Sequence, residues 1–121
     1  MPRIGLNHVM LVGQVASEPR YKITSGKQLP RLWFRVQTTE RYRDENGGER
    51  ERRSYHSVVL WGHLASDAHD SLREGHAVLV EGRLTSRSYE SAGAKRYEVE
   101  VVATRFVVLS GAESGAALDA A

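Results

Sequence analysis

Two large aromatic rings stand on one face of a strand predicted at residues 54–62. β-Branched and aromatic residues crowd this stretch and a glycine closes it, which favours a strand. Because strand side chains alternate between faces, Tyr55 and Trp61 point one way and His56 the other. The rings are about 20 Å apart along the strand, at about 3.3 Å per residue. That spacing leaves room for several stacked nucleobases, whereas the simpler interpretation places both rings in the core.

Arginines are interleaved with further rings on positions predicted to face outward. Every nucleobase has a π-face, so flat rings bind single strands without reading sequence, and arginines meet the phosphates. The candidate residues are Trp33, Arg35, Arg41, Tyr42, Arg43, Arg53, Tyr55, Trp61, Arg83, Arg87 and Tyr89. For each arginine alone, a solvated surface charge is the simpler explanation. Their interleaving with the rings predicts a face that binds nucleic acid.

Five segments with a period of two predict the strands that position these side chains. They are residues 7–16, 31–39, 50–62, 77–89 and 97–109, with a short return strand at 21–23. In the second segment, Leu32, Phe34 and Val36 alternate toward the core, which leaves Trp33 exposed beside Arg35. In the later segments, Leu84 shares a face with Val78 and Val80, and Tyr97 and Val99 share a face with Val101 and Ala103.

Glycines and a change of period mark the connections. Gly13 predicts a bend or bulge within the first strand. Residues 42–48 end in Asn-Gly-Gly and predict a hairpin tip, and residues 91–94 predict another turn. An apolar stripe predicts a helix, with Gly75 in the position of a C-cap. The stripe consists of Leu64, Ala65, Ala68 and Leu72.

Length and composition indicate one ordinary globular domain, since 121 residues suffice for a single modest core. The formal net charge is only +2, but all 17 basic residues precede residue 111, whereas Glu113 and Asp119 follow it. The first 110 residues are therefore mildly basic, which is compatible with a polyanionic partner. The chain has no cysteine and no run of 18 apolar residues, so we expect no disulfide, thiolate metal site or membrane span.

The order strand, strand, strand, helix, strand, strand predicts an all-β fold. It is the element order of the OB-fold, a five-stranded Greek-key barrel that binds oligonucleotides and oligosaccharides, here with one short helix between strands 3 and 4. We expect residues 1–110 to form this domain. Residues 111–121 are rich in Gly, Ala and Ser and are expected to be a disordered tail.

Three stretches together resemble the bacterial single-stranded DNA-binding protein family. They are residues 7–13, residues 55–65, and residues 80–84 with 87–89, in register over roughly residues 3–110. The resemblance implies an OB-fold homotetramer that binds single-stranded DNA without sequence specificity in replication, recombination and repair. It also implies a bacterial cytoplasmic location, associated with the nucleoid.

The resemblance also implies roles for individual residues. The family's stacking aromatics fall on Tyr42, Tyr55, Trp61 and Tyr89. Relatives often carry tryptophan at the first, second and fourth of these, so this chain has a smaller ring at three positions. The family's interface histidine falls on His56, on the face opposite Tyr55. Weaker electrostatics than the family norm are expected, because relatives often carry a base at the positions of Glu45, Glu51, Glu74 and Thr85.

The last residues of the chain depart from the family pattern. The family ends in a tail tipped by acidic residues, proline and phenylalanine, whereas residues 117–121 read Ala-Leu-Asp-Ala-Ala. We therefore expect that repair and replication partners that recognise the acidic tip are not recruited.

Catalysis finds little support in the sequence. His63 and His69 are six residues apart and lack the i, i+4 spacing of a helical metal site. Asp67 and Asp70 are interpreted as surface charges, so we expect no enzyme, metal or cofactor. Two alternatives stay open: a primosome-type accessory OB-fold protein, dimeric and acting through protein–protein contacts, and an oligosaccharide-binding OB module.

Overall fold

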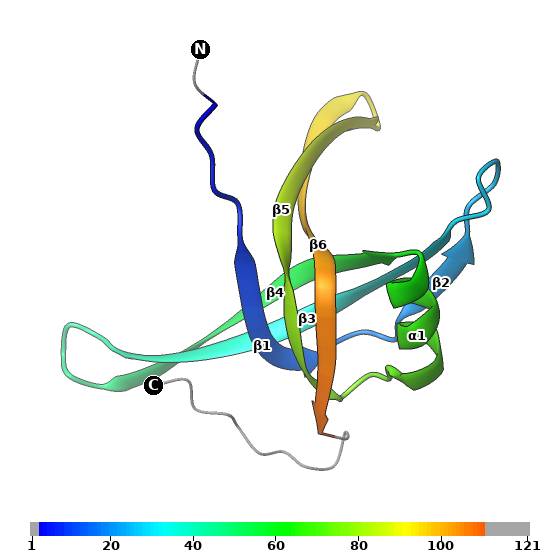
Figure 1. The fold of residues 1–121 in the computed structure, drawn as a ribbon. Helices are drawn as coiled ribbons and strands as arrows, with labels where there is room; N and C mark the ends of the chain where they lie inside the picture. Colours follow the sequence, from blue (N-terminus) through cyan, green and yellow to red (C-terminus); the bar gives the residue numbers. More distant parts are fainter. Residues whose placement is uncertain (1–2, 111–121) are drawn as a thin grey trace.

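Five long strands close into a barrel in the computed structural model, which describes residues 3–110 (Figure 1). The elements are β1 (Val9–Val15), β2 (Arg20–Ile23), β3 (Pro30–Arg43), β4 (Glu49–Trp61), α1 (His63–Ser71), β5 (Ala77–Ser91) and β6 (Ala94–Ser110). β2 is a short strand that pairs only with β3. The predicted OB-fold barrel, with one helix between its third and fourth strands, is confirmed. The predicted tail at 111–121 lies outside the described residues.

The barrel closes because β1 pairs with two strands. The sheet runs in the order β1-β5-β6-β4-β3-β2, and β1 also pairs with β3 through Gln14 opposite Gln37 and Val15 opposite Val36. All pairs are antiparallel except β4 with β6. Closure of the sheet on itself satisfies backbone groups that would otherwise form open edges.

Two glycines allow backbones to approach closely where the barrel bends. A Cβ at Gly13 would collide with the Gln37 carbonyl oxygen and lie 2.8 Å from Val36 Cγ1. Of the bend or bulge predicted at Gly13, the bulge is wrong, because the β1–β5 register runs through Gly13 without a break. The irregularity lies instead on β6, where Thr104 is the extra residue between the partners of Glu81 and Gly82, and a Cβ on Gly82 would collide with the Val102 carbonyl oxygen. Glycine is needed at both places for close approach rather than for a left-handed φ.

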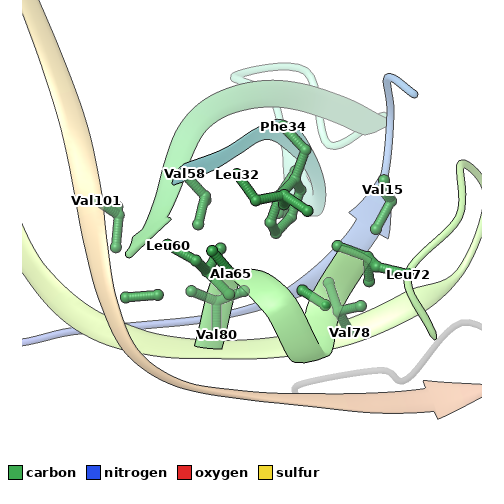
Figure 2. Close-up of a cluster of buried hydrophobic side chains, with 13 residues drawn as sticks. Val15, Leu32, Phe34, Val58, Leu60, Ala65, Leu72, Val78, Val80 and Val101 are labelled. Atoms are coloured by element: carbon green, nitrogen blue, oxygen red, sulfur yellow. The ribbon is translucent and has the colours of Figure 1, made fainter. Parts of the chain in front are cut away.

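The core lies inside the barrel and is closed at one end by α1 (Figures 1 and 2). The predicted inward residues of β3, Leu32, Phe34 and Val36, are all fully buried. Figure 2 shows Leu32 and Phe34 with side chains from β1, β4, α1, β5 and β6. Besides the three β3 residues, the cluster includes Val15, Val58, Leu60, Ala65, Ala68, Leu72, Val78, Val80, Val101 and Ala103. One apolar cluster from all five barrel strands and the helix therefore holds the fold together.

The helix ends earlier than the sequence predicts. α1 stops at Ser71, and Leu72 is extended and buried in the core. Gly75 has a φ of 94° and its N–H donates to the Val15 carbonyl oxygen at 2.8 Å. Gly75 is therefore a turn residue that ties the helix exit to β1, and its assignment as the C-cap is wrong.

Both long hairpins extend beyond the barrel (Figure 1). In the β3–β4 arm (residues 38–54), pairing continues to Arg43 opposite Glu49, so only residues 44–48 form the turn. In the β5–β6 arm (residues 84–99), Leu84, Tyr97 and Val99 are exposed, although they share a face with core residues of the same strands. Alternation assigns a face, but no opposing layer covers that face past the end of the barrel.

Candidate nucleic-acid interface

A continuous outer face runs across four neighbouring strands, opposite the core. Alternation from the buried positions places on it Trp33 and Arg35 of β3, Tyr55, Ser57 and Trp61 of β4, Glu98 and Glu100 of β6, and Arg83, Thr85, Arg87 and Tyr89 of β5. The strands are connected across this face, because Ser57 lies opposite Glu100 and Glu100 lies opposite Thr85. The structure therefore brings most of the predicted residues onto one surface, called the outer face below.

The rings on the outer face differ in exposure. Tyr55 is 58% exposed, and Trp61 and Tyr89 are also exposed. The sequence predicts that Trp33 is exposed. In the structure Trp33 is half-buried, and the side chains of Arg20 and Arg35 flank its ring. Val59 lies on the same face and is fully buried, with Trp33 and Val102 as its register partners. Open rings thus stand at both ends of this stretch of β4, with packed side chains between them.

Arginine side chains lie over the rings of Trp33 and Trp61. Arg20 and Arg31 come from positions on neighbouring strands that the sequence does not reveal. The guanidinium carbon of Arg20 on β2 is 5.7 Å from the centroid of the Trp33 ring, and that of Arg35 is 6.0 Å away. The guanidinium carbon of Arg31 is 5.6 Å from the centroid of the Trp61 ring, and the two residues are directly opposite each other in the β3–β4 register. Sequence reasoning missed Arg20 and Arg31. Cation–π contacts of this kind hold a cation close to the face of a ring.

An open hollow of about 440 Å³ lies beside the aromatic rings and arginines of the outer face. Its lining consists of Ala16, Ser17, Glu18, Arg20, Trp33, Arg35 and Tyr55. Hollows of roughly 300–1,000 Å³ accommodate small ligands. Two aromatic rings, two arginines and the carboxylate of Glu18 thus surround a space of the size of one nucleotide.

The predicted residues of the β3–β4 arm do not all join the outer face. Arg41, Arg43 and Arg53 share its side by alternation, whereas Tyr42 shares the side of Val36. Tyr42 is exposed, and the guanidinium carbon of Arg52, a residue that sequence reasoning missed, lies 4.9 Å from its ring centroid. The arm therefore carries a second ring and arginine on its other side.

Two of the arginines predicted to bind DNA form ion pairs with glutamates. Arg53 Nη2 lies 3.8 Å from Glu51 Oε2, with both side chains well exposed. Arg87 Nη2 donates to Glu98 Oε2 at 2.9 Å. The hydrogen bond to Glu98, followed by the nearby charge of Glu100, raises the pKa of the Arg87 guanidinium. Arg87 is thus held by carboxylates on the face that the sequence assigns to phosphates.

His56 lies on the opposite face of β4 from Tyr55, as alternation predicts. It is half-buried, and its Nε2 lies 2.9 Å from the Thr38 hydroxyl oxygen.

In the part of the chain that the structure describes, no three metal-ligating side chains come together, and no helix is long and apolar enough to cross a membrane.

Comparisons with known proteins agree with this geometry. The model of the single-strand binding protein family matches residues 6–109. Single-stranded DNA-binding protein 1 of Chlorobaculum tepidum is 36% identical over 113 residues, which cover 92% of this chain and 69% of that protein.

Two solved structures have folds similar to that of this chain. A Plasmodium falciparum SSB in complex with ssDNA has a TM-score of 0.84 and 25% identity, covering 91% of this chain and 100% of that one. A deletion mutant of the Thermus aquaticus single-stranded DNA-binding protein has a TM-score of 0.80 and 37% identity, covering 88% of this chain and 52% of that one.

Proposed function

The chain belongs to the single-strand binding protein family, and from that premise we propose that it binds single-stranded DNA without sequence specificity. Bases stack on Tyr55, Trp61 and Tyr89, and phosphates are met by the arginines beside them. The observation that carries this proposal is the exposure of Tyr55 and Trp61 on one face, next to the hollow flanked by Arg20 and Arg35. By family membership, the activity serves replication, recombination and repair on the bacterial chromosome.

The mechanism follows from the chemistry of the outer face. A ring offers the same π-surface to every base, so stacking holds the strand without reading it. Arg31 and Arg35 already lie over tryptophan rings, so each cation stands where the backbone of a stacked nucleotide would pass. Tyrosine offers less area than tryptophan, so Tyr55 and Tyr89 are expected to contribute less than Trp61.

A titration of tryptophan emission with oligo-dT tests this proposal. The variant Trp33→Phe leaves Trp61 as the single reporter, and binding should quench its emission because a base stacks on the ring. Repeating the titration at two salt concentrations should show a clear loss of affinity with salt, since phosphate contacts release counterions. A steep loss of affinity with salt would exclude the oligosaccharide-binding alternative. Absence of quenching at either salt concentration would contradict stacking on Trp61.

A homotetramer is the second part of the proposal. Family membership supports it, and so does apolar surface along β1 and the residues before it, where Ile4, Leu6, Met10 and Val12 are exposed in the protomer. His56 is proposed to lie at a protomer contact, on the side of β4 away from the DNA. The primosome-type alternative predicts a dimer and weak strand binding.

Light scattering at micromolar protein is expected to give four times the protomer mass of 13.5 kDa. His56→Lys should yield smaller species, because a cation in a desolvated contact is costly unless it is paired. Thr38→Val removes the hydrogen-bond partner of His56 within the protomer and serves as the control, which should stay tetrameric. A wild-type dimer would favour the accessory protein, and a tetrameric His56→Lys variant would remove His56 from the interface.

A further inference from the structure

Two carboxylates stand in the middle of the outer face. Glu98 is directly opposite Arg87 in the β5–β6 register, and the two side chains form the 2.9 Å ion pair. The Glu98 side chain is 28% exposed, whereas that of Arg87 is 58% exposed. The carboxylate is therefore the more shielded partner, so the pair is less weakened by solvent than one between two open side chains.

Glu100 adds a second negative charge on the same face. It lies between Ser57 of β4 and Thr85 of β5 in register, two residues from Glu98. Its Oε2 atom is buried without a hydrogen-bond partner within the described structure. Its charge also acts on Arg87. Arg87 thus stands beside two carboxylates rather than as a free cation waiting for a phosphate.

The other arginines on this side are less constrained. Within residues 3–110 no ion pair involves Arg83 or Arg35. The Arg53–Glu51 pair is longer, at 3.8 Å, and both of its side chains are well exposed. Glu98 is therefore the acidic residue that most directly competes with DNA for a cation of the outer face.

We propose that Glu98 sets the single-strand affinity of this protein by holding Arg87, so that a phosphate must displace the Glu98 carboxylate to reach the guanidinium. The inference rests on the proposed function. A phosphate that takes the place of Glu98 leaves a carboxylate beside the strand, so binding at Arg87 exchanges one anion for another. The exchange lowers affinity and reduces the net counterion release at this position.

The experiment measures binding of labelled oligo-dT by fluorescence anisotropy at several salt concentrations. Glu98→Gln keeps the shape of the side chain and removes its charge, so affinity should rise about two- to fivefold, the range of a partly exposed ion pair. The slope of log K against log salt should become steeper by about 0.7, the value for one phosphate contact on a single strand. Glu90→Gln is the matched control, because it removes the same charge from the other strand of the same hairpin, on the opposite face.

A second variant keeps the proposal falsifiable if Glu98→Gln disturbs the arm. Arg87→Ala should weaken binding less than about twofold in the wild-type background, but it should abolish the gain in the Glu98→Gln background. Equal affinities of Glu98→Gln and Glu90→Gln would overturn the inference, and so would a loss of more than about fivefold in Arg87→Ala alone. Wild-type protein that binds no oligo-dT would overturn the proposed function, whereas normal wild-type binding with an unchanged Glu98→Gln variant overturns only the role of Glu98.

Discussion

Replacing Tyr55 and Trp61 together with alanine should remove most of the single-strand affinity while the barrel stays folded. A stacked base contributes about 1–3 kcal/mol per ring by alanine substitution, so the double variant should lose about 2–6 kcal/mol. The two rings are far enough apart along β4 for their contributions to be nearly additive. Neither Tyr55 nor Trp61 belongs to the buried apolar cluster, so truncating them leaves that cluster intact.

The measurement is anisotropy of labelled oligo-dT, with circular dichroism to confirm the fold. Tyr97→Ala is the control, because Tyr97 is 73% exposed but lies on the opposite face of β6 from Glu98 and Glu100. Its affinity should match that of the wild type. If the double variant binds as tightly as Tyr97→Ala, the outer face is not where the bases stack.

Gly82→Ala should destabilise the barrel by about 3 kcal/mol, at the upper end of what overpacking usually costs. A Cβ at this position would collide with the Val102 carbonyl oxygen and lie 2.9 Å from Ala103 Cα. Both obstacles are backbone atoms of the paired strand β6, which cannot rotate away as a flexible side chain can. Gly82 also lies opposite the β-bulge of β6, so the collision falls at an irregular point of the β5–β6 pairing.

Urea unfolding followed by circular dichroism measures this effect. Gly5→Ala is the matched control, because no atom lies within 4 Å of the Cβ it would add. The control should unfold at the wild-type midpoint, whereas Gly82→Ala should unfold at a clearly lower urea concentration. Coincident unfolding curves for the two variants would show that β5 and β6 can separate at the bulge at little cost.

Alternation along each strand made the core and the outer face predictable. Leu32, Phe34 and Val36 are buried, and Tyr55 and His56 lie on opposite faces, because successive side chains of any strand point to opposite sides. The turn at residues 44–48 was likewise predictable, since Gly47, with a φ of 78°, supplies the conformation that the hairpin needs. These are local properties of a short stretch of chain.

Where a strand leaves the barrel could not be predicted from its own pattern. Leu84 and Val99 alternate in step with buried residues, yet they are exposed because no second layer covers that part of the hairpin. Trp33 shows the opposite case, since its position indicates exposure but Arg20 from β2 flanks it. Burial depends on what packs against a face, which is a property of the whole fold.

The OB-fold order of elements, the family and the rings of the outer face can all be recognised in the sequence. Which charges meet these rings and each other depends on how the strands pair in the folded barrel. Arg31 beside Trp61 and Arg87 paired with Glu98 follow from the registers of β3 with β4 and of β5 with β6. A register is set by turn geometry and barrel closure over many residues, whereas the alternation that reveals a face repeats every two.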